Sequence, residues 1–169
     1  FFQPVYASDQ VRVYRLLPWP TDKPLATFLP GEVNFMGYVI DTPVAEETTD
    51  EAPMSGQSFL VTAWRLSSPL LADYTMYVHF ITDDGRVVTQ ADHPLVSWTL
   101  AGLVPTSKWQ PGRLYLDIAP LPPELQSVAA PLTMGIGLWV PQTEARLLPQ
   151  SGSLAIDPAN RLIIGTHSM

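Results

Sequence analysis

Residues 76–94 read MYVHFITDDGRVVTQADHP, and this stretch decides the fold. Two runs of alternating polar and apolar residues flank the dipeptide Asp84-Gly85, which is typical of a tight β-hairpin turn of type I′. Asp83 and Asp84 are therefore interpreted as turn residues, since both types favour turns. The stretch predicts two antiparallel strands, with Val78 and Phe80 on the face that packs into the core.

The register of this hairpin follows if Asp83 pairs with Arg86. The expected facing pairs are Ile81–Val88, His79–Gln90 and Tyr77–Asp92. Asp92 then lies diagonal to His79 on the same face, within side-chain reach. We interpret His79, Gln90 and Asp92 as a structural polar group. A zinc site needs three or four converging ligands and only His79 and Asp92 converge, so no metal site is assigned.

The rest of the chain predicts more strands of the same kind. Eighteen prolines and ten glycines divide it into short segments, which favours an all-β fold over a helical one. Expected strands cover residues 10–17, 33–40, 58–66, 74–82, 86–92, 113–119 and 132–140, with shorter pieces near Arg146, Leu154 and Ile163. One helical turn is expected at 123–125, and residues 41–57 are interpreted as an exposed loop. The prediction is a two-sheet antiparallel β-sandwich of jelly-roll or immunoglobulin-like type, with about nine or ten strands.

Charge and composition exclude several classes of function. The net charge is −7, and the nine Lys and Arg residues form no basic stripe, which argues against a nucleic-acid partner. The chain has no cysteine, so it has neither disulfides nor a thiolate metal site. A glycine-rich phosphate loop, a nucleophile elbow and an HExxH motif are all missing from the sequence, and no cofactor or catalytic residue is assigned. Carboxylates that meet only in the fold leave a small hydrolase as an alternative.

Two tryptophans flank the segment TLAGLVPTSKWQPG, whose turn residues predict a loop. Exposed indole rings stack on the apolar faces of sugars, so this loop is a candidate glycan site. The expected contacts are Trp98, Thr106, Trp109 and Gln110, with Ser97 and Ser107 near them in sequence. The favoured alternative is that Trp109 plugs one end of the sandwich and anchors the loop.

The order of motifs resembles that of a known family. The segments are VNFMGYVID, SGQSFLVTAWRL, DYTMYVHFITDDGRVVTQADHP, PTSKWQPGRLYLD and LTMGIGLWVPQTEARL. They resemble the soluble C-terminal domain of bacterial polytopic membrane glycosyltransferases that are similar to dolichyl-phosphate-mannose protein mannosyltransferases. The matching positions are Gly37-Tyr38, Trp64, Asp73-Tyr74, His79, Asp84-Gly85, Gln90, Asp92, Pro94, Pro105-Thr106, Trp109, Gly112, Asp117, Gly137 and Arg146-Leu147. Trp139 stands where the family pattern has tyrosine, and the loop at 41–57 is longer than usual.

This resemblance implies a non-catalytic accessory domain at the extracytoplasmic face of a cell membrane, joined to the membrane-embedded part of the same protein. The expected partner is a glycan or a glycolipid head group. Residues 1–169 are interpreted as one β-sandwich domain, with 1–20 as a lead-in strand segment. Since the sequence begins at Phe1, we expect a fragment of a longer protein. A free-standing carbohydrate-binding module is the second hypothesis, ahead of the hydrolase.

Overall fold

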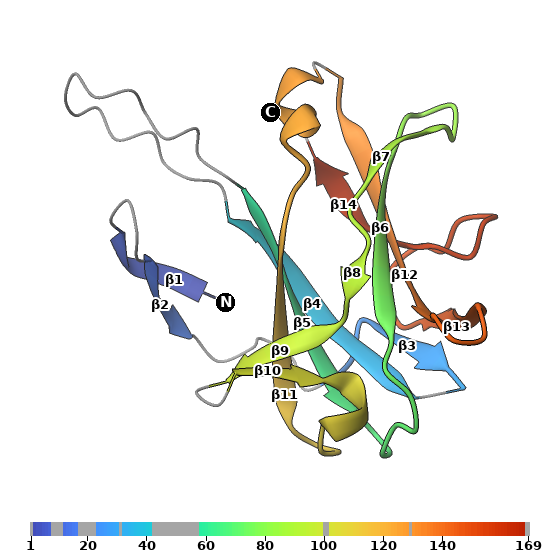
Figure 1. Cartoon of the computed structure of the whole chain (residues 1–169). Helices are drawn as coiled ribbons and strands as arrows, with labels where there is room; N and C mark the ends of the chain where they lie inside the picture. Colours follow the sequence, from blue (N-terminus) through green and yellow to red (C-terminus); the bar gives the residue numbers. More distant parts are fainter. Residues whose placement is uncertain are drawn as a thin grey trace.

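The computed structural model describes residues 2–7, 12–16, 23–30, 32–41, 58–99, 102–128 and 130–167. Within these ranges the secondary structure consists of strands and two short 3-10 helices, which confirms the predicted all-β sandwich (Figure 1). Fourteen strands are present in the described ranges, more than the sequence predicts. The expected helical turn is the 3-10 helix η2 (Pro123–Ser127). No helix in the described part of the chain is long and apolar enough to cross a membrane.

Eight strands form one continuous antiparallel sheet in the order β11-β5-β4-β3-β13-β12-β6-β7, and β14 and β8 pair with β12 and β6. Their bounds are β3 (Ala26–Leu29), β4 (Val33–Asp41), β5 (Phe59–Leu66), β6 (Thr75–Ile81), β7 (Val87–Gln90), β8 (His93–Pro94), β11 (Leu114–Pro120), β12 (Leu132–Val140), β13 (Ala145–Ser151) and β14 (Leu162–His167). Two further antiparallel pairs stand apart from this sheet. They are β1 (Phe2–Ala7) with β2 (Arg12–Leu16), and β9 (Val96–Thr99) with β10 (Gly102–Pro105).

The long sheet bends into two layers at β13 (Figure 1). The first residues of β13 pair with β12, and residues 148–151 pair with β3. One layer therefore consists of β11, β5, β4 and β3, and the other contains β12, β14, β6, β7 and β8. A strand that passes from one sheet to the other is a common way to close one edge of a sandwich.

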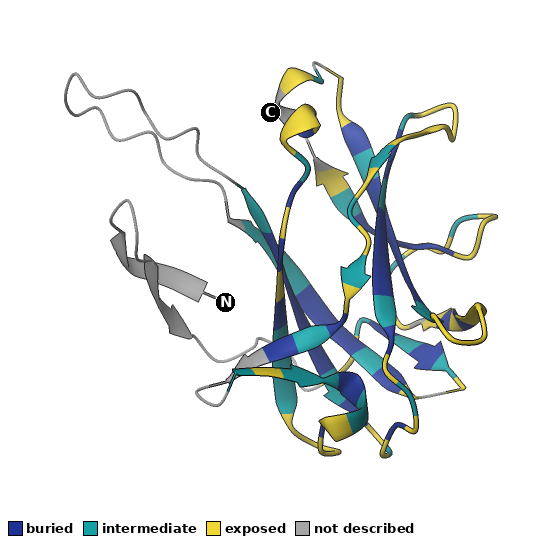
Figure 2. Cartoon of the chain, viewed as in Figure 1, coloured by how far each residue is buried: buried dark blue, intermediate teal, exposed yellow. Residues whose placement is uncertain are grey.

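The core lies between the two layers (Figure 2). Alternate side chains of each strand point inward, and Val78 and Phe80 of β6 are fully buried there as predicted. On the facing layer Trp64 is the largest fully buried side chain, and its ring makes an edge contact with Phe35 at a centroid distance of 5.1 Å. Aromatic packing of this kind stabilises the sandwich from within.

The turn between β6 and β7 differs from the predicted type I′ turn. The Thr82 amide donates to the Arg86 carbonyl at 3.0 Å, and the Gly85 amide donates to the Thr82 carbonyl at 2.8 Å. Gly85 has a φ of +84°, and Asp84 is not among the residues with positive φ. The loop therefore has three residues, a type I turn followed by a glycine bulge, because aspartate at the earlier position keeps the ordinary negative φ.

This bulge changes the register by one residue near the turn. Ile81 pairs with Val87 rather than with Val88, so that part of the predicted register is wrong. The shift lies between Phe80 and Ile81, and beyond it His79 faces Gln90 as predicted. An extra residue in one strand of an antiparallel pair displaces only the pairs on its far side.

The segment between the two tryptophans is a β-hairpin and not the predicted loop. Thr99 pairs with Gly102, whose φ of +108° favours a tight reversal of the chain. The 3-10 helix η1 (Thr106–Lys108) follows directly. The expected loop at 41–57 lies outside the described residues apart from Asp41, which ends β4. Strands β3, β8, β9 and β10 have no counterpart among the predicted strands, and β1 lies within the predicted lead-in strand segment 1–20.

Candidate functional site

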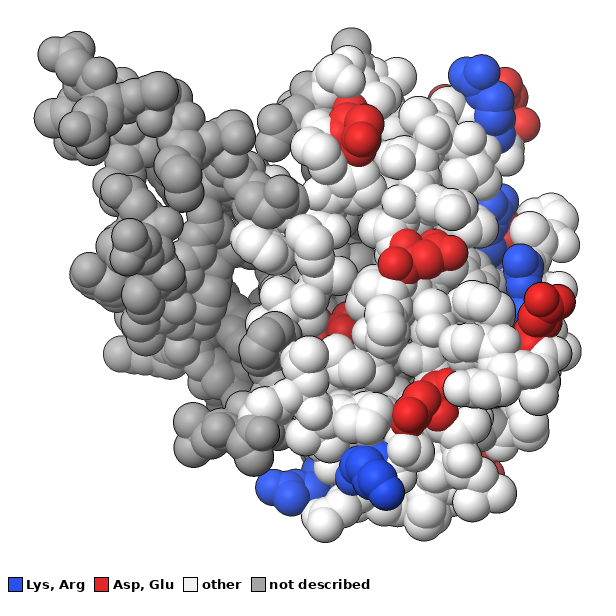
Figure 3. Space-filling model, viewed as in Figure 1, with Lys and Arg blue, Asp and Glu red and all other residues white. Residues whose placement is uncertain are grey.

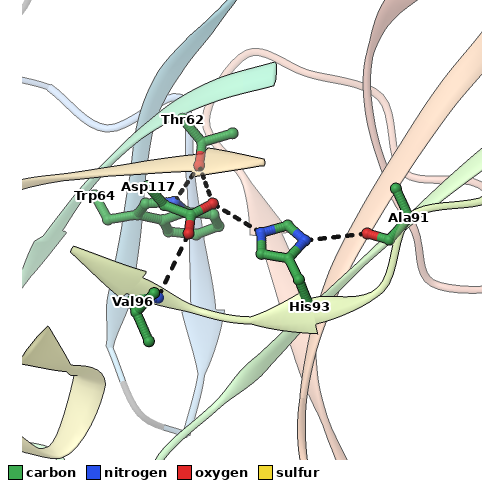
Figure 4. Close-up of polar contacts among 6 residues, drawn as sticks. All are labelled: Thr62, Trp64, Ala91, His93, Val96 and Asp117. Carbon is green, nitrogen blue, oxygen red and sulfur yellow. Dashed lines mark hydrogen bonds and ion pairs between the residues drawn. The ribbon is translucent and has the colours of Figure 1, made fainter. Parts of the chain in front are cut away.

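A buried carboxylate joins the two layers at the edge opposite β13 (Figure 4). Asp117 of β11 is only 1% exposed. Its Oδ2 atom accepts hydrogen bonds from His93 Nε2 at 2.9 Å and from Thr62 Oγ1 at 3.3 Å. Its Oδ1 atom accepts a hydrogen bond from the Val96 backbone N–H at 3.4 Å. Thr62 Oγ1 in turn accepts a hydrogen bond from Trp64 Nε1 at 2.7 Å. These donors stabilise a charge that would be costly to bury alone.

His93 uses both of its ring nitrogens in this arrangement. Nδ1 lies 3.1 Å from the Ala91 carbonyl, and Nε2 contacts Asp117. Burial alone lowers the pKa of the imidazole, but the hydrogen bond and charge of Asp117, with the Ala91 carbonyl, outweigh it and raise the pKa above its ordinary value. Both partners are acceptors, so the protonated ring donates through both nitrogens, and both nitrogens are occupied by contacts within the protein.

His79 lies in a separate polar cluster on the outer face of the second layer. It faces Gln90, but its Nδ1 atom lies 3.3 Å from Nη1 of Arg161, and the Arg161 Nε atom forms an ion pair with Asp157 at 2.6 Å. Asp92 is exposed and acts on the ring through its charge. Burial, the largest effect, lowers the pKa of His79 below its ordinary value despite the opposing charge of Asp92.

The described residues contain no group of three or more His, Asp or Glu side chains that could hold a metal ion. The two histidines of the opening stretch thus belong to different clusters, one on each side of the second layer. Arg161, the hydrogen-bonding partner of His79, is 82 residues away along the chain, and no local pattern in the sequence indicates this contact.

A groove of about 330 Å³ lies between the β9–β10 hairpin and β11. It is lined by Ser97, Val104, Lys108, Gln110, Arg113, Leu114, Tyr115 and Leu116. Its lining includes both polar and apolar side chains, and the charged ones are Lys108 and Arg113. This volume is at the lower end of the range of about 300–1,000 Å³ for small-molecule sites.

An aromatic stack makes one wall of the groove rigid. The Tyr115 ring lies parallel to the Trp109 ring at a centroid distance of 4.5 Å and an interplanar angle of 5°. Trp109 is buried, and its Nε1 atom donates to the Val104 carbonyl at 2.9 Å. The Gln110 amide donates to the Tyr115 hydroxyl at 2.7 Å. Both rings are thus fixed before any ligand arrives.

The four expected glycan contacts have different surroundings. Trp109 is buried, as expected of a side chain that plugs one end of the sandwich. Thr106 is also buried, and its hydroxyl accepts the Tyr74 amide and donates to the Ala72 carbonyl. Gln110 is exposed and lines the groove, whereas the side chain of Trp98 lies outside the described residues.

Sequence reasoning missed Tyr115, Lys108 and Arg113 as groove residues. Tyr115 lies within a strand and reads as a core residue. Lys108 lies within the segment TLAGLVPTSKWQPG and Arg113 follows it directly, but only the aromatic and neutral polar residues of that region were considered as ligand contacts.

The comparisons with known proteins show a likeness in fold. No protein-family model matches the sequence, and no curated protein matches it. The crystal structure of the C-terminal domain of wzt is similar, with a TM-score of 0.50 and 14% identity over 90% of this chain and 84% of that one. A calcium-binding mutant of Bacteroides uniformis beta-glucuronidase 2 has a TM-score of 0.41 and 14% identity, over 68% of this chain. The chain spans only 12% of the length of that protein.

Proposed function

We propose that this chain is a non-catalytic glycan-binding domain and that the groove beside β11 holds one sugar residue. The observation that carries the proposal is the Tyr115 ring, stacked on the buried Trp109, in the lining of a groove that also offers polar and apolar side chains. A sugar has apolar C–H faces and a rim of hydroxyl groups, and this lining offers partners to both. The groove is fixed by packing, so binding orders few side chains.

The lining of the groove supplies both polar partners and an apolar surface. Gln110, Ser97 and the Tyr115 hydroxyl are available for hydrogen bonds with sugar hydroxyls, and Val104, Leu114 and Leu116 supply the apolar surface. Few contacts of this kind give weak binding, with an expected Kd on the order of 0.1–1 mM. A membrane-anchored enzyme would use such affinity to hold a long glycan at many successive positions.

The hydrolase alternative has less support. Asp117 and His93 are the acid and base that the structure brings together, but His93 has both nitrogens occupied and Asp117 is buried under three donors. A general base must reach the proton that it removes. The dyad is therefore interpreted as a structural connection between layers.

The second part of the proposal concerns the larger protein to which this domain belongs. The family resemblance supports an accessory domain of a membrane glycosyltransferase on the extracytoplasmic side, with residues 1–169 as one domain that holds glycan or acceptor near the membrane-embedded part. The full reading frame tests this. Hydrophobic spans of about 20 residues upstream of Phe1 are expected. A secretion signal directly upstream would instead support a free-standing carbohydrate-binding module.

Binding itself is tested by titration of oligosaccharides into the isotope-labelled protein, with amide chemical shifts as the readout. We expect shifts at residues around the groove, and a several-fold loss of affinity in Gln110→Ala. The matched control is Gln142→Ala, which removes an exposed glutamine in the turn between β12 and β13. An absence of shifts with neutral and acidic glycans at tens of millimolar would overturn the proposal.

A further inference from the structure

The groove has a charge opposite to that of the chain as a whole. The sequence has sixteen acidic and nine basic residues, for a net charge of −7. Of the eight residues that line the groove, Lys108 and Arg113 are basic and none is acidic. Figure 3 shows basic side chains at the lower end of this face, where η1 and the start of β11 lie. A cationic groove on an acidic domain indicates an anionic ligand.

The guanidinium of Arg113 is held in place by a neutral partner. Its Nη1 atom donates to Gln110 Oε1 at 3.1 Å, and the backbone N–H of Gln110 donates to the Tyr115 hydroxyl. This contact positions the fork of donors and leaves its charge uncompensated. Among the described residues, neither Arg113 nor Lys108 has a carboxylate within salt-bridge distance. A planar fork of this kind matches a carboxylate or a phosphate with two parallel hydrogen bonds.

The carboxylate of Asp73 lies near η1 but does not line the groove. It accepts the Ser107 amide at 3.0 Å. More distant carboxylates act weakly, because the screening length at physiological ionic strength is about 8 Å. Lys108 and Arg113 are therefore the charged groups that line the groove itself, despite the negative net charge of the chain.

We propose that the groove selects an acidic sugar, one that carries an oxyanion such as a carboxylate or a phosphate. This inference rests on the proposed glycan-binding function and specifies its ligand class. Arg113 binds the oxyanion through its fork, Lys108 contributes a second positive charge, and Tyr115, held in place by its stack on the buried Trp109, packs against the sugar. Neutral sugars lack the group that the two cations bind.

The test compares trigalacturonate with its methyl ester, which has the same sugar ring without the negative charge. Because hydrogen bonds to charged groups are the strong ones, we expect the free acid to bind at least about tenfold more tightly in chemical-shift titrations. Glucose 6-phosphate against glucose is the second pair and distinguishes a phosphate preference from a carboxylate preference. In either pair, the preference of the protein for the charged ligand over the neutral one should shrink as salt is added.

Arg113→Gln should lower the affinity for the free acid to the affinity for its ester. The fold should be retained, because Arg113 is exposed. Lys108→Gln should reduce the preference in part. Arg86→Gln is the matched control, since it removes the same charge from the β6–β7 turn at the other end of the molecule (Figure 1). Equal affinity for acid and ester, or a preference that survives Arg113→Gln, would overturn this inference and leave glycan binding intact. Binding of no glycan at all would overturn both.

Discussion

His93 Nε2 lies 2.9 Å from Asp117 Oδ2, and this contact joins the two layers of the sandwich at the edge opposite β13. His93 belongs to β8 beside β6, and Asp117 belongs to β11, the last strand of the other layer. At the opposite edge the backbone of β13 makes the same connection. The side-chain connection differs from the backbone one because it depends on pH.

The stability of the protein should therefore fall as pH rises above neutrality. The pKa of His93 is raised in the folded state from an ordinary value of about 6.5. Folding thus favours the protonated ring, and this contribution is fully present below about pH 6.5 and is lost as pH rises through the folded-state pKa. Urea unfolding between about pH 5.5 and 9 measures it as a declining midpoint.

His93→Gln should remove that decline and cost about 1–3 kcal/mol at pH 6, since Asp117 loses a charged hydrogen-bond donor. At a pH above the raised folded-state pKa of His93, where the ring of the unsubstituted protein is neutral, the two proteins should differ less. A His93→Gln protein with the same pH profile as the parent would show that another group causes the decline.

His79 should affect stability in the opposite direction. Burial lowers its pKa in the folded state, so the neutral ring is favoured on folding. Its contribution is present above about pH 6.5 and is lost as pH falls through the lower folded-state pKa. His79→Gln, which cannot be protonated, should therefore flatten the acid side of the pH profile and leave the alkaline side unchanged. The ring signals of His79 in NMR titrations, shifting below pH 6.5, provide an independent measurement.

The sequence predicts the sandwich because its inward and outward positions alternate within single strands. Val78 and Phe80 are correctly placed in the core from this alternation, and His79 correctly faces Gln90. Such information is local, since each position depends on neighbours two residues away. The turn type was wrong because Asp84-Gly85 fits both a two-residue turn and a three-residue loop with a glycine bulge.

The groove could not be predicted in the same way. It requires that the β9–β10 hairpin lie against β11, a contact between segments that the sequence does not relate by any period. The contact between His93 and Asp117 spans 24 residues and crosses from one layer to the other. Pairing within a hairpin follows from the spacing of residues around a turn in the sequence. Packing between the two layers depends on how the side chains of distant segments fit together.

Trp109 should be a stabilising plug rather than a sugar platform. Its ring is buried against Tyr115, so Trp109→Ala removes a large core side chain at a cost of about 3–5 kcal/mol. The Tm should fall by roughly 6–20 °C. Trp109→Phe, which keeps an aromatic ring in the stack, should lose less. If Trp109→Ala kept its Tm and lost glycan binding instead, the ring would be a platform and the plug interpretation would be wrong.

Gly137 should be required because the Tyr77 ring lies directly over it. A Cβ atom at this position would overlap with the ring atoms of Tyr77, which is buried and also holds the Arg146 guanidinium 5.2 Å from its centroid. Gly137 is not among the residues with positive φ, so this contact and not backbone strain sets the cost. Gly137→Ala is expected to destabilise the protein by about 1–3 kcal/mol through overpacking. In a Tyr77→Ala background the same change should cost little, and a double-mutant cycle of unfolding free energies measures the difference. Equal costs in both backgrounds would show that Gly137 serves the strand itself rather than the ring above it.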